Sequence, residues 1–179
     1  MTTWGYTTLE KVYSYDPTPA SLTPEQTKYI KGEQRNVWTE YIATPEHVEN
    51  MMMPRMPALE VVWSQPSHKN WEDFKRRMDK QYDRYEAIGV NYAITTFNVQ
   101  QFVRIDSASK QAIVLMKTDS YQPEIRFTIN GEEPTIKSSR YIHPFTLNKN
   151  VTIKAACSVM ANKLEKPLFR LLLYRSNAT

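Results

Sequence analysis

The spacing of hydrophobic residues changes near residue 92, and the change predicts a helical half followed by a β half. Between residues 71 and 88, apolar side chains recur every three or four positions, which forms one stripe along an α-helix. Asn70 before the stripe and Gly89 after it are residue types that begin and end helices. Beyond residue 92, short apolar or alternating runs separated by turn residues are typical of strands.

Two shorter helices are predicted upstream from their first residues. Thr23 and Thr44 each precede a proline, which is favoured at the first helical position, and their hydroxyls can cap the helix. Gln26 adds the second half of a capping box to the first of them. We therefore expect helices to begin at residues 24 and 45.

Residues 32–40, with the sequence GEQRNVWTE, predict a strand with two unlike faces. One face ends in Trp38 and Glu40, and the other carries Glu33 and Arg35. An indole beside a carboxylate suits a sugar, because the ring can stack on a pyranose while the carboxylate accepts hydrogen bonds from hydroxyls. From these residues alone, a core tryptophan and a surface acid remain the better interpretation.

The second half predicts a small antiparallel, immunoglobulin-like β-sandwich. Asn130-Gly131 is the strongest turn signal in the chain and predicts a tight hairpin. The expected strands cover residues 92–99, 102–105, 112–117, 124–129, 141–147, 151–158 and 168–174.

Composition fits a folded protein and narrows its chemistry. The hydrophobic content of 41% is typical of a folded protein. At 179 residues, the chain is too short for a complete (β/α)8 barrel, which needs about 250 residues. The net charge is +4, and the excess of cations lies after residue 100. Because these cations are scattered along the chain, we expect them to form a solvated surface, and we expect no nucleic-acid partner. No apolar run is long enough for a membrane span, and no signal peptide is recognisable.

No cofactor or metal site is expected. The single cysteine, Cys157, offers no metal-type spacing, and we expect an inert buried thiol. His47, His68 and His143 lie in unlike segments, so we interpret them as exposed or capping residues.

The run GEQRNVWTEY at residues 32–41 resembles the last barrel strand of the β-N-acetylhexosaminidases of glycoside hydrolase family 20, especially their Bacteroides-like branch. The sequence GYTTLEKVYSYDP at residues 5–17 and the pair Pro54-Arg55 agree with this resemblance. Over residues 105–175 the chain resembles the C-terminal β-domain of chitobiases and hexosaminidases. The run IRFTINGEEPT at residues 125–135 is similar to a hairpin motif of that domain.

The resemblance implies an α+β chain with two domains. Residues 1–100 would be a helix-rich remnant of the end of a TIM barrel, and residues 101–179 the β-sandwich. The partner of such a barrel remnant would be the missing N-terminal part of the barrel. By the same resemblance, the parent enzyme would be periplasmic or secreted.

The resemblance also implies a function and a limit to it. Trp38 would stack against the N-acetylhexosamine of a glycan, and Glu40 would hold the outer hydroxyls of that sugar. The family uses substrate-assisted catalysis with an adjacent Asp-Glu pair. This chain contains no such pair, so no catalytic residue is assigned and the chain is expected to be inactive alone. The alternative is a non-catalytic accessory module that binds glycan or protein through its sandwich.

One departure from the family pattern concerns the second face of the predicted strand. Family members usually carry small or apolar residues where Glu33 and Arg35 stand. Two charged side chains beneath the outer helices are unfavourable unless they pair with each other or reach solvent.

Overall fold

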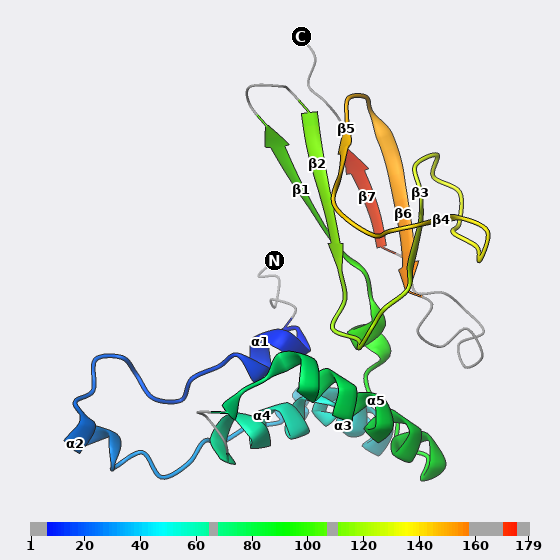
Figure 1. Ribbon diagram of the computed structural model, residues 1–179. Helices are drawn as coiled ribbons and strands as arrows, with labels where there is room; N and C mark the ends of the chain where they lie inside the picture. Colours follow the sequence, from blue (N-terminus) through cyan, green and yellow to red (C-terminus); the bar gives the residue numbers. More distant parts are fainter. Residues whose placement is uncertain (1–6, 65–67, 107–110, 158–169, 175–179) are drawn as a thin grey trace. The chain divides into compact units, whose positions relative to one another are not determined.

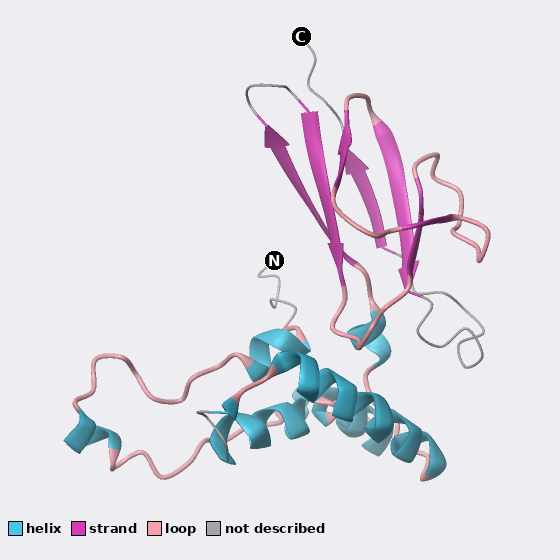
Figure 2. Cartoon of the chain, in the orientation of Figure 1, coloured by secondary structure: helices cyan, strands magenta, loops and turns pink. Residues whose placement is uncertain are grey.

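The computed structural model describes residues 7–64, 68–106, 111–157 and 170–174 (Figure 1). It divides into two compact units, Met1–Ala93 and Ile94–Thr179. Helices form the regular structure of the first unit and antiparallel strands dominate the second (Figure 2). The mixed α+β content is therefore confirmed. Along the sequence, the first unit ends at Ala93, a few residues before the boundary expected at residue 100.

The expected helices form, and their caps explain where they begin. The hydroxyl of Thr23 accepts a hydrogen bond from the Gln26 amide at 3.3 Å, and the capping box is complete. The side chain of Asn70 caps the longest helix, which ends before Gly89 at a φ of +72°. The helical segments are α1 (Leu9–Tyr13), α2 (Pro24–Thr27), η1 (Thr39–Tyr41), α3 (Pro45–Met52), α4 (Arg55–Ser64) and α5 (Trp71–Ala87).

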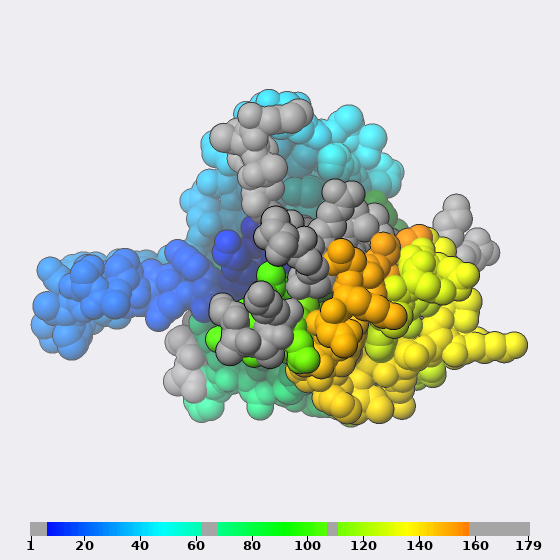
Figure 3. All heavy atoms as spheres, turned by 90° about the horizontal axis from the view of Figure 1, so that it is seen from above, coloured from blue at the N-terminus to red at the C-terminus, as the bar shows by residue number. Residues whose placement is uncertain are grey.

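The core of the first unit is rich in aromatic rings. The ring of Tyr13 on α1 lies 4.7 Å from that of Phe74 on α5, centroid to centroid, and Trp71 lies beside both. Further along α5, Tyr82 packs against Tyr92 at 4.9 Å. These contacts bury one face of α5, as its apolar stripe predicts. By contrast, α2 and its flanking loops project away from this core and are exposed (Figures 1 and 3).

In the described part of the second unit, seven strands form two sheets. One sheet has the order β1-β2-β5 and the other the order β4-β3-β6-β7, and all strand pairs are antiparallel. Strand β2 alternates between buried and exposed residues, as expected for a sheet with one face on a core. The strands are β1 (Gln100–Asp106), β2 (Gln111–Lys117), β3 (Ile125–Thr128), β4 (Ser139–Arg140), β5 (Phe145–Leu147), β6 (Val151–Cys157) and β7 (Arg170–Tyr174).

Both sheets contribute to a single core in this unit. Val114 of β2 and Ile153 of β6 are fully buried in the same cluster, which also contains Val99 and Leu147. The two sheets are therefore layered on a shared apolar interior, as in a small sandwich.

Two expected β features of the second half take other forms. The strand expected at 92–99 is absent, and the 3₁₀ turn η3 (Ile94–Phe97) occupies that stretch. Asn130 does not begin a two-residue hairpin, because β4, the next strand and an antiparallel partner of β3, starts only at Ser139. Instead, the side chain of Asn130 accepts a hydrogen bond from the Glu132 amide at 3.1 Å.

The prediction of a strand at residues 32–40 is wrong. Residues 31–38 are extended but belong to no sheet, and η1 begins at Thr39. The physical reason is the lack of a partner: among the residues that the structure describes, every strand lies at Gln100 or beyond. A strand needs a neighbour to pair its backbone groups, whereas a helix pairs its own.

We expect amide hydrogen exchange to separate the paired strands from this unpaired segment. The amides of β6 around Ile153 should exchange much more slowly than those around Trp38, because β6 is hydrogen-bonded on both sides. Exchange measured by NMR on the whole chain tests this. Stronger protection at Trp38 than at Ile153 would contradict it.

Candidate functional site

The extended segment, residues 31–38, keeps the two faces predicted from its sequence. Glu33, Arg35 and Val37 are half-buried, whereas Gln34 and Asn36 between them are exposed. The alternation therefore has a period of two without any sheet.

Trp38 and Glu40 lie on one pocket of about 970 Å³. The indole of Trp38 is 70% exposed, so it is not a core residue. The pocket has two walls, one formed by residues 35–42 and the other by the exposed side of α3. Its lining consists of Arg35, Asn36, Val37, Trp38, Glu40, Tyr41, Ile42, His47 and Met51.

Arg35 joins the two walls of this pocket. Its guanidinium donates to the carbonyl oxygens of Met51 and Met52, the latter at 3.2 Å, at the C-terminal end of α3. Carbonyls at a helix end lack intrahelical partners, and a cation there is favourable. Burial, and then the nearby Arg55, lower the pKa of Arg35, which remains charged because arginine ionises far above neutrality. Arg35 thus does not pair with Glu33, one of the two arrangements expected from the sequence, but stays half-buried and bound to backbone carbonyls.

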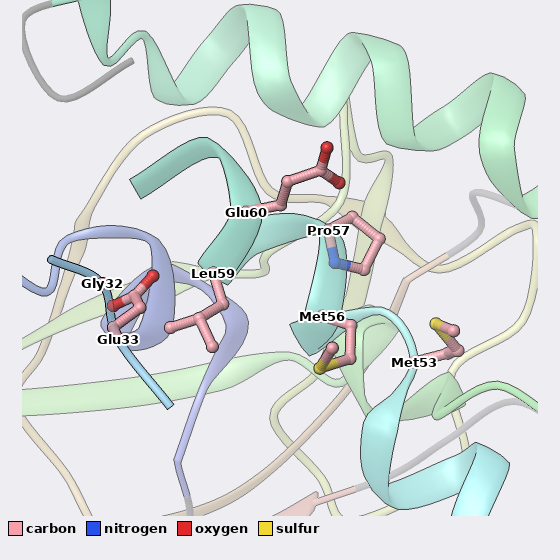
Figure 4. Close-up of a pocket in the computed structure, with 7 residues that line it drawn as sticks. All are labelled: Gly32, Glu33, Met53, Met56, Pro57, Leu59 and Glu60. Carbon is pink, nitrogen blue, oxygen red and sulfur yellow. The ribbon is translucent and has the colours of Figure 1, made fainter. Parts of the chain in front are cut away.

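Glu33 points into a different environment. It lines a separate pocket of about 550 Å³ with Gly32, Met53, Met56, Pro57, Leu59 and Glu60 (Figure 4). Both carboxylate oxygens of Glu33 are inaccessible to water, and neither has a hydrogen-bond partner among the residues that the structure describes. Burial raises the pKa of Glu33, and Lys69 opposes this rise. An ionised carboxylate in such a place destabilises the fold.

Charged side chains of α5 pair with one another. The basic run of α5 is a solvated face, since Arg76 and Arg77 both pair with Asp73, at 2.7 and 3.0 Å. Hydrogen bonds from these two arginines lower the pKa of Asp73. Within the described part of the chain, no group of three or more His, Cys, Asp or Glu side chains could hold a metal ion. Nor is any described helix both long and apolar enough to cross a bilayer.

Comparison with protein families matches both halves of the chain. Residues 1–66 match the model for the glycosyl hydrolase family 20 catalytic domain, and residues 95–167 match that for the chitobiase/beta-hexosaminidase C-terminal domain. The resemblance to glycoside hydrolase family 20 is thereby confirmed. The pocket with Trp38 and Glu40 lies inside the family-20 segment, and the β-sandwich coincides with the chitobiase-type domain.

Two curated relatives carry corresponding names. A beta-hexosaminidase of Porphyromonas gingivalis is 30% identical over 165 residues, which are 89% of this chain and 21% of that protein. A beta-N-acetylhexosaminidase of Cellulomonas fimi is 26% identical over 91 residues, 49% of this chain and 18% of that protein. The chain spans about a fifth of the length of these two relatives.

Sequence reasoning named two of the residues that line this pocket, Trp38 and Glu40, but missed the wall that α3 supplies. His47 and Met51 are one turn apart on that helix and both line the pocket. A signal was present, because the Thr44-Pro45 helix start places His47 in the first turn after the extended segment. The sequence predicts an exposed or capping role for this histidine, and its side chain is exposed.

Proposed function

We propose that this chain is the C-terminal segment of an exo-acting β-N-acetylhexosaminidase and holds part of its sugar pocket. The observation that carries the proposal is that Trp38 and Glu40 line one pocket within the family-20 segment. The substrate would be a glycan that ends in β-linked N-acetylglucosamine or N-acetylgalactosamine. The family match and the names of the relatives support this class of substrate.

The chemistry of the two side chains is complementary to a pyranose. An exposed indole offers a broad apolar surface to the apolar face of the ring. The carboxylate of Glu40 can only accept hydrogen bonds, and sugar hydroxyls are donors that form strong bonds to an ionised acceptor. One residue would therefore position the ring and the other would recognise its hydroxyls.

Catalysis itself would depend on parts of the enzyme outside this chain. Family-20 enzymes use the acetamido group of the substrate as the nucleophile, steered by an Asp-Glu pair that this sequence lacks. We propose that residues 32–38 become the last strand of a (β/α)8 barrel when the rest of the barrel is present. Their extended backbone and alternating faces support this. The parent enzyme would be exported to the periplasm or beyond, on the basis of resemblance alone.

One observation favours a second candidate function for the chitobiase-type domain. Phe102 of β1 and Leu115 of β2 are directly paired, and their side chains are exposed on the outer face of the sheet beside Ile113. A row of exposed apolar side chains is typical of an interaction surface. An accessory module that binds glycan or protein through this face is therefore the alternative.

The proposed pocket predicts a specific response to N-acetylglucosamine. In a titration of the chain to tens of millimolar sugar, followed by NMR, the indole N–H signal of Trp38 should shift. Glu40→Gln should weaken the apparent affinity roughly three- to tenfold, because a neutral amide replaces a charged acceptor.

The chain supplies its own controls for this titration. Trp71 is packed between Tyr13 and Phe74, so its indole signal should stay in place. Trp38→Ala should abolish the sugar response of the remaining signals around the pocket. A titration in which no pocket signal moves would contradict the proposed site.

A further inference from the structure

The pocket of Trp38 and Glu40 needs a hydrogen-bond donor other than Arg35, whose guanidinium already binds α3. Sugars present oxygen atoms that accept hydrogen bonds as well as hydroxyls that donate them. Glu40 can only accept. The guanidinium of Arg35 is engaged by the carbonyls of α3.

His47 is a donor of a different kind within this lining. Its side chain is exposed and lines the pocket, and no side-chain hydrogen bond or ion pair of His47 is found among the described residues. A neutral imidazole has one N–H donor, and a protonated one has two. His47 can therefore donate to a sugar without breaking an internal contact.

The backbone that carries His47 is held in place at its cap. The His47 amide donates to the Thr44 hydroxyl at 3.2 Å and to the Thr44 carbonyl at 3.1 Å. The side chain of Asn91 donates to the Glu46 carbonyl at 2.8 Å, one residue before His47.

The other end of the helix is also tied to the pocket. Arg35, from the opposite wall, binds the last carbonyls of α3. The helix is thus held at its start by the cap and at its end by the pocket's other wall. A contact to a ligand is stronger when its supporting element is already ordered.

We propose that His47 is a substrate-contacting residue of this pocket, donating a ring N–H to an oxygen of the bound N-acetylhexosamine while Glu40 accepts from its hydroxyls. This inference rests on the proposed function and adds a residue from α3 to its site. It assigns the helix that follows the extended segment a direct part in sugar recognition.

The test follows the three histidines of the chain in one experiment. In the N-acetylglucosamine titration, the imidazole C–H signals of His47 should shift with the same saturation curve as the Trp38 indole. His68 and His143 should not shift, since neither lines the pocket. Glycerol at the same concentration controls for bulk solvent effects.

A variant separates hydrogen bonding from mere proximity. His47→Phe keeps a ring and removes both nitrogens, and it should weaken N-acetylglucosamine binding roughly three- to tenfold, the range of one neutral hydrogen bond. His47→Gln, which retains a donor, should recover part of the affinity. Circular dichroism of each variant checks that α3 is intact.

The outcomes distinguish this inference from the proposed function. If Trp38 responds to the sugar and His47 does not, or if His47→Phe binds as the wild type does, the role of His47 is refuted while the pocket stands. If neither Trp38 nor His47 responds, the proposed function of the pocket fails together with the inference.

Discussion

The purified 179-residue chain is expected to hydrolyse no aryl N-acetyl-β-glucosaminide above the background rate. Trp38 and Glu40 can hold a sugar, but neither is placed by its proposed role to protonate the glycosidic oxygen. Loss of a general acid alone typically lowers the rate by about 10²–10⁴-fold. The residue that would steer the acetamido group is missing as well, because no Asp-Glu pair occurs in the sequence. Release of 4-nitrophenol from the aryl substrate measures the rate directly.

The matched blank is the same chain carrying Trp38→Ala and Glu40→Gln, which removes the proposed sugar contacts of these two residues and leaves the rest of the site in place. Wild-type chain and blank should give the same rate. A known β-N-acetylhexosaminidase, run alongside, shows that the assay detects turnover. Turnover by the wild-type chain that the double variant lacks would refute the proposal that catalysis needs groups outside these residues.

Local sequence signals predicted much of this fold. The helix starts at Thr23 and Thr44 and the long helix between Asn70 and Gly89 depend on contacts within one or two turns, so neighbouring residues are sufficient to determine them. Buried strands such as β2 and β6 were also predicted, because burial on one or both faces leaves a short, readable apolar pattern.

The errors concern features that depend on distant partners. Residues 32–40 have a strand pattern, but a strand forms only beside another strand, and the described residues supply none there. Likewise, the binding of Arg35 to the end of α3 depends on how the chain folds back on itself. The contribution of His47 to the pocket depends on the same fold, because the Thr44-Pro45 helix start indicates only its position in the helix.

Glu33→Leu is expected to stabilise the first unit by about 1–3 kcal/mol at pH 7, the usual cost of a buried polar group without a partner. Both oxygens of Glu33 are buried, and Met53, Met56 and Leu59 surround a pocket that a leucine side chain could share. Urea unfolding followed by tryptophan fluorescence measures the change. Tryptophan fluorescence reports on the first unit, because all four tryptophans of the chain precede residue 94.

The gain should depend on pH in a direction that follows from the raised pKa of Glu33. Folding favours the protonated form of this carboxyl, so its contribution to stability is fully present below the ordinary pKa of 4.5 and is lost as pH rises through the folded-state pKa. The advantage of Glu33→Leu should therefore be largest at pH 7, shrink as pH falls through the raised folded-state pKa, and be smallest below pH 4.5.

Glu60→Leu is the matched control for this prediction. Glu60 lines the same pocket but is exposed, so its replacement should change stability by less than about 0.5 kcal/mol and without the same pH dependence. Glu33→Gln separates charge from polarity, since it removes the pH dependence but leaves a buried amide. If Glu33→Leu instead destabilises the unit at pH 7, the carboxylate must make a favourable contact outside the described residues, and its burial would be a stabilising feature of the family-20 segment.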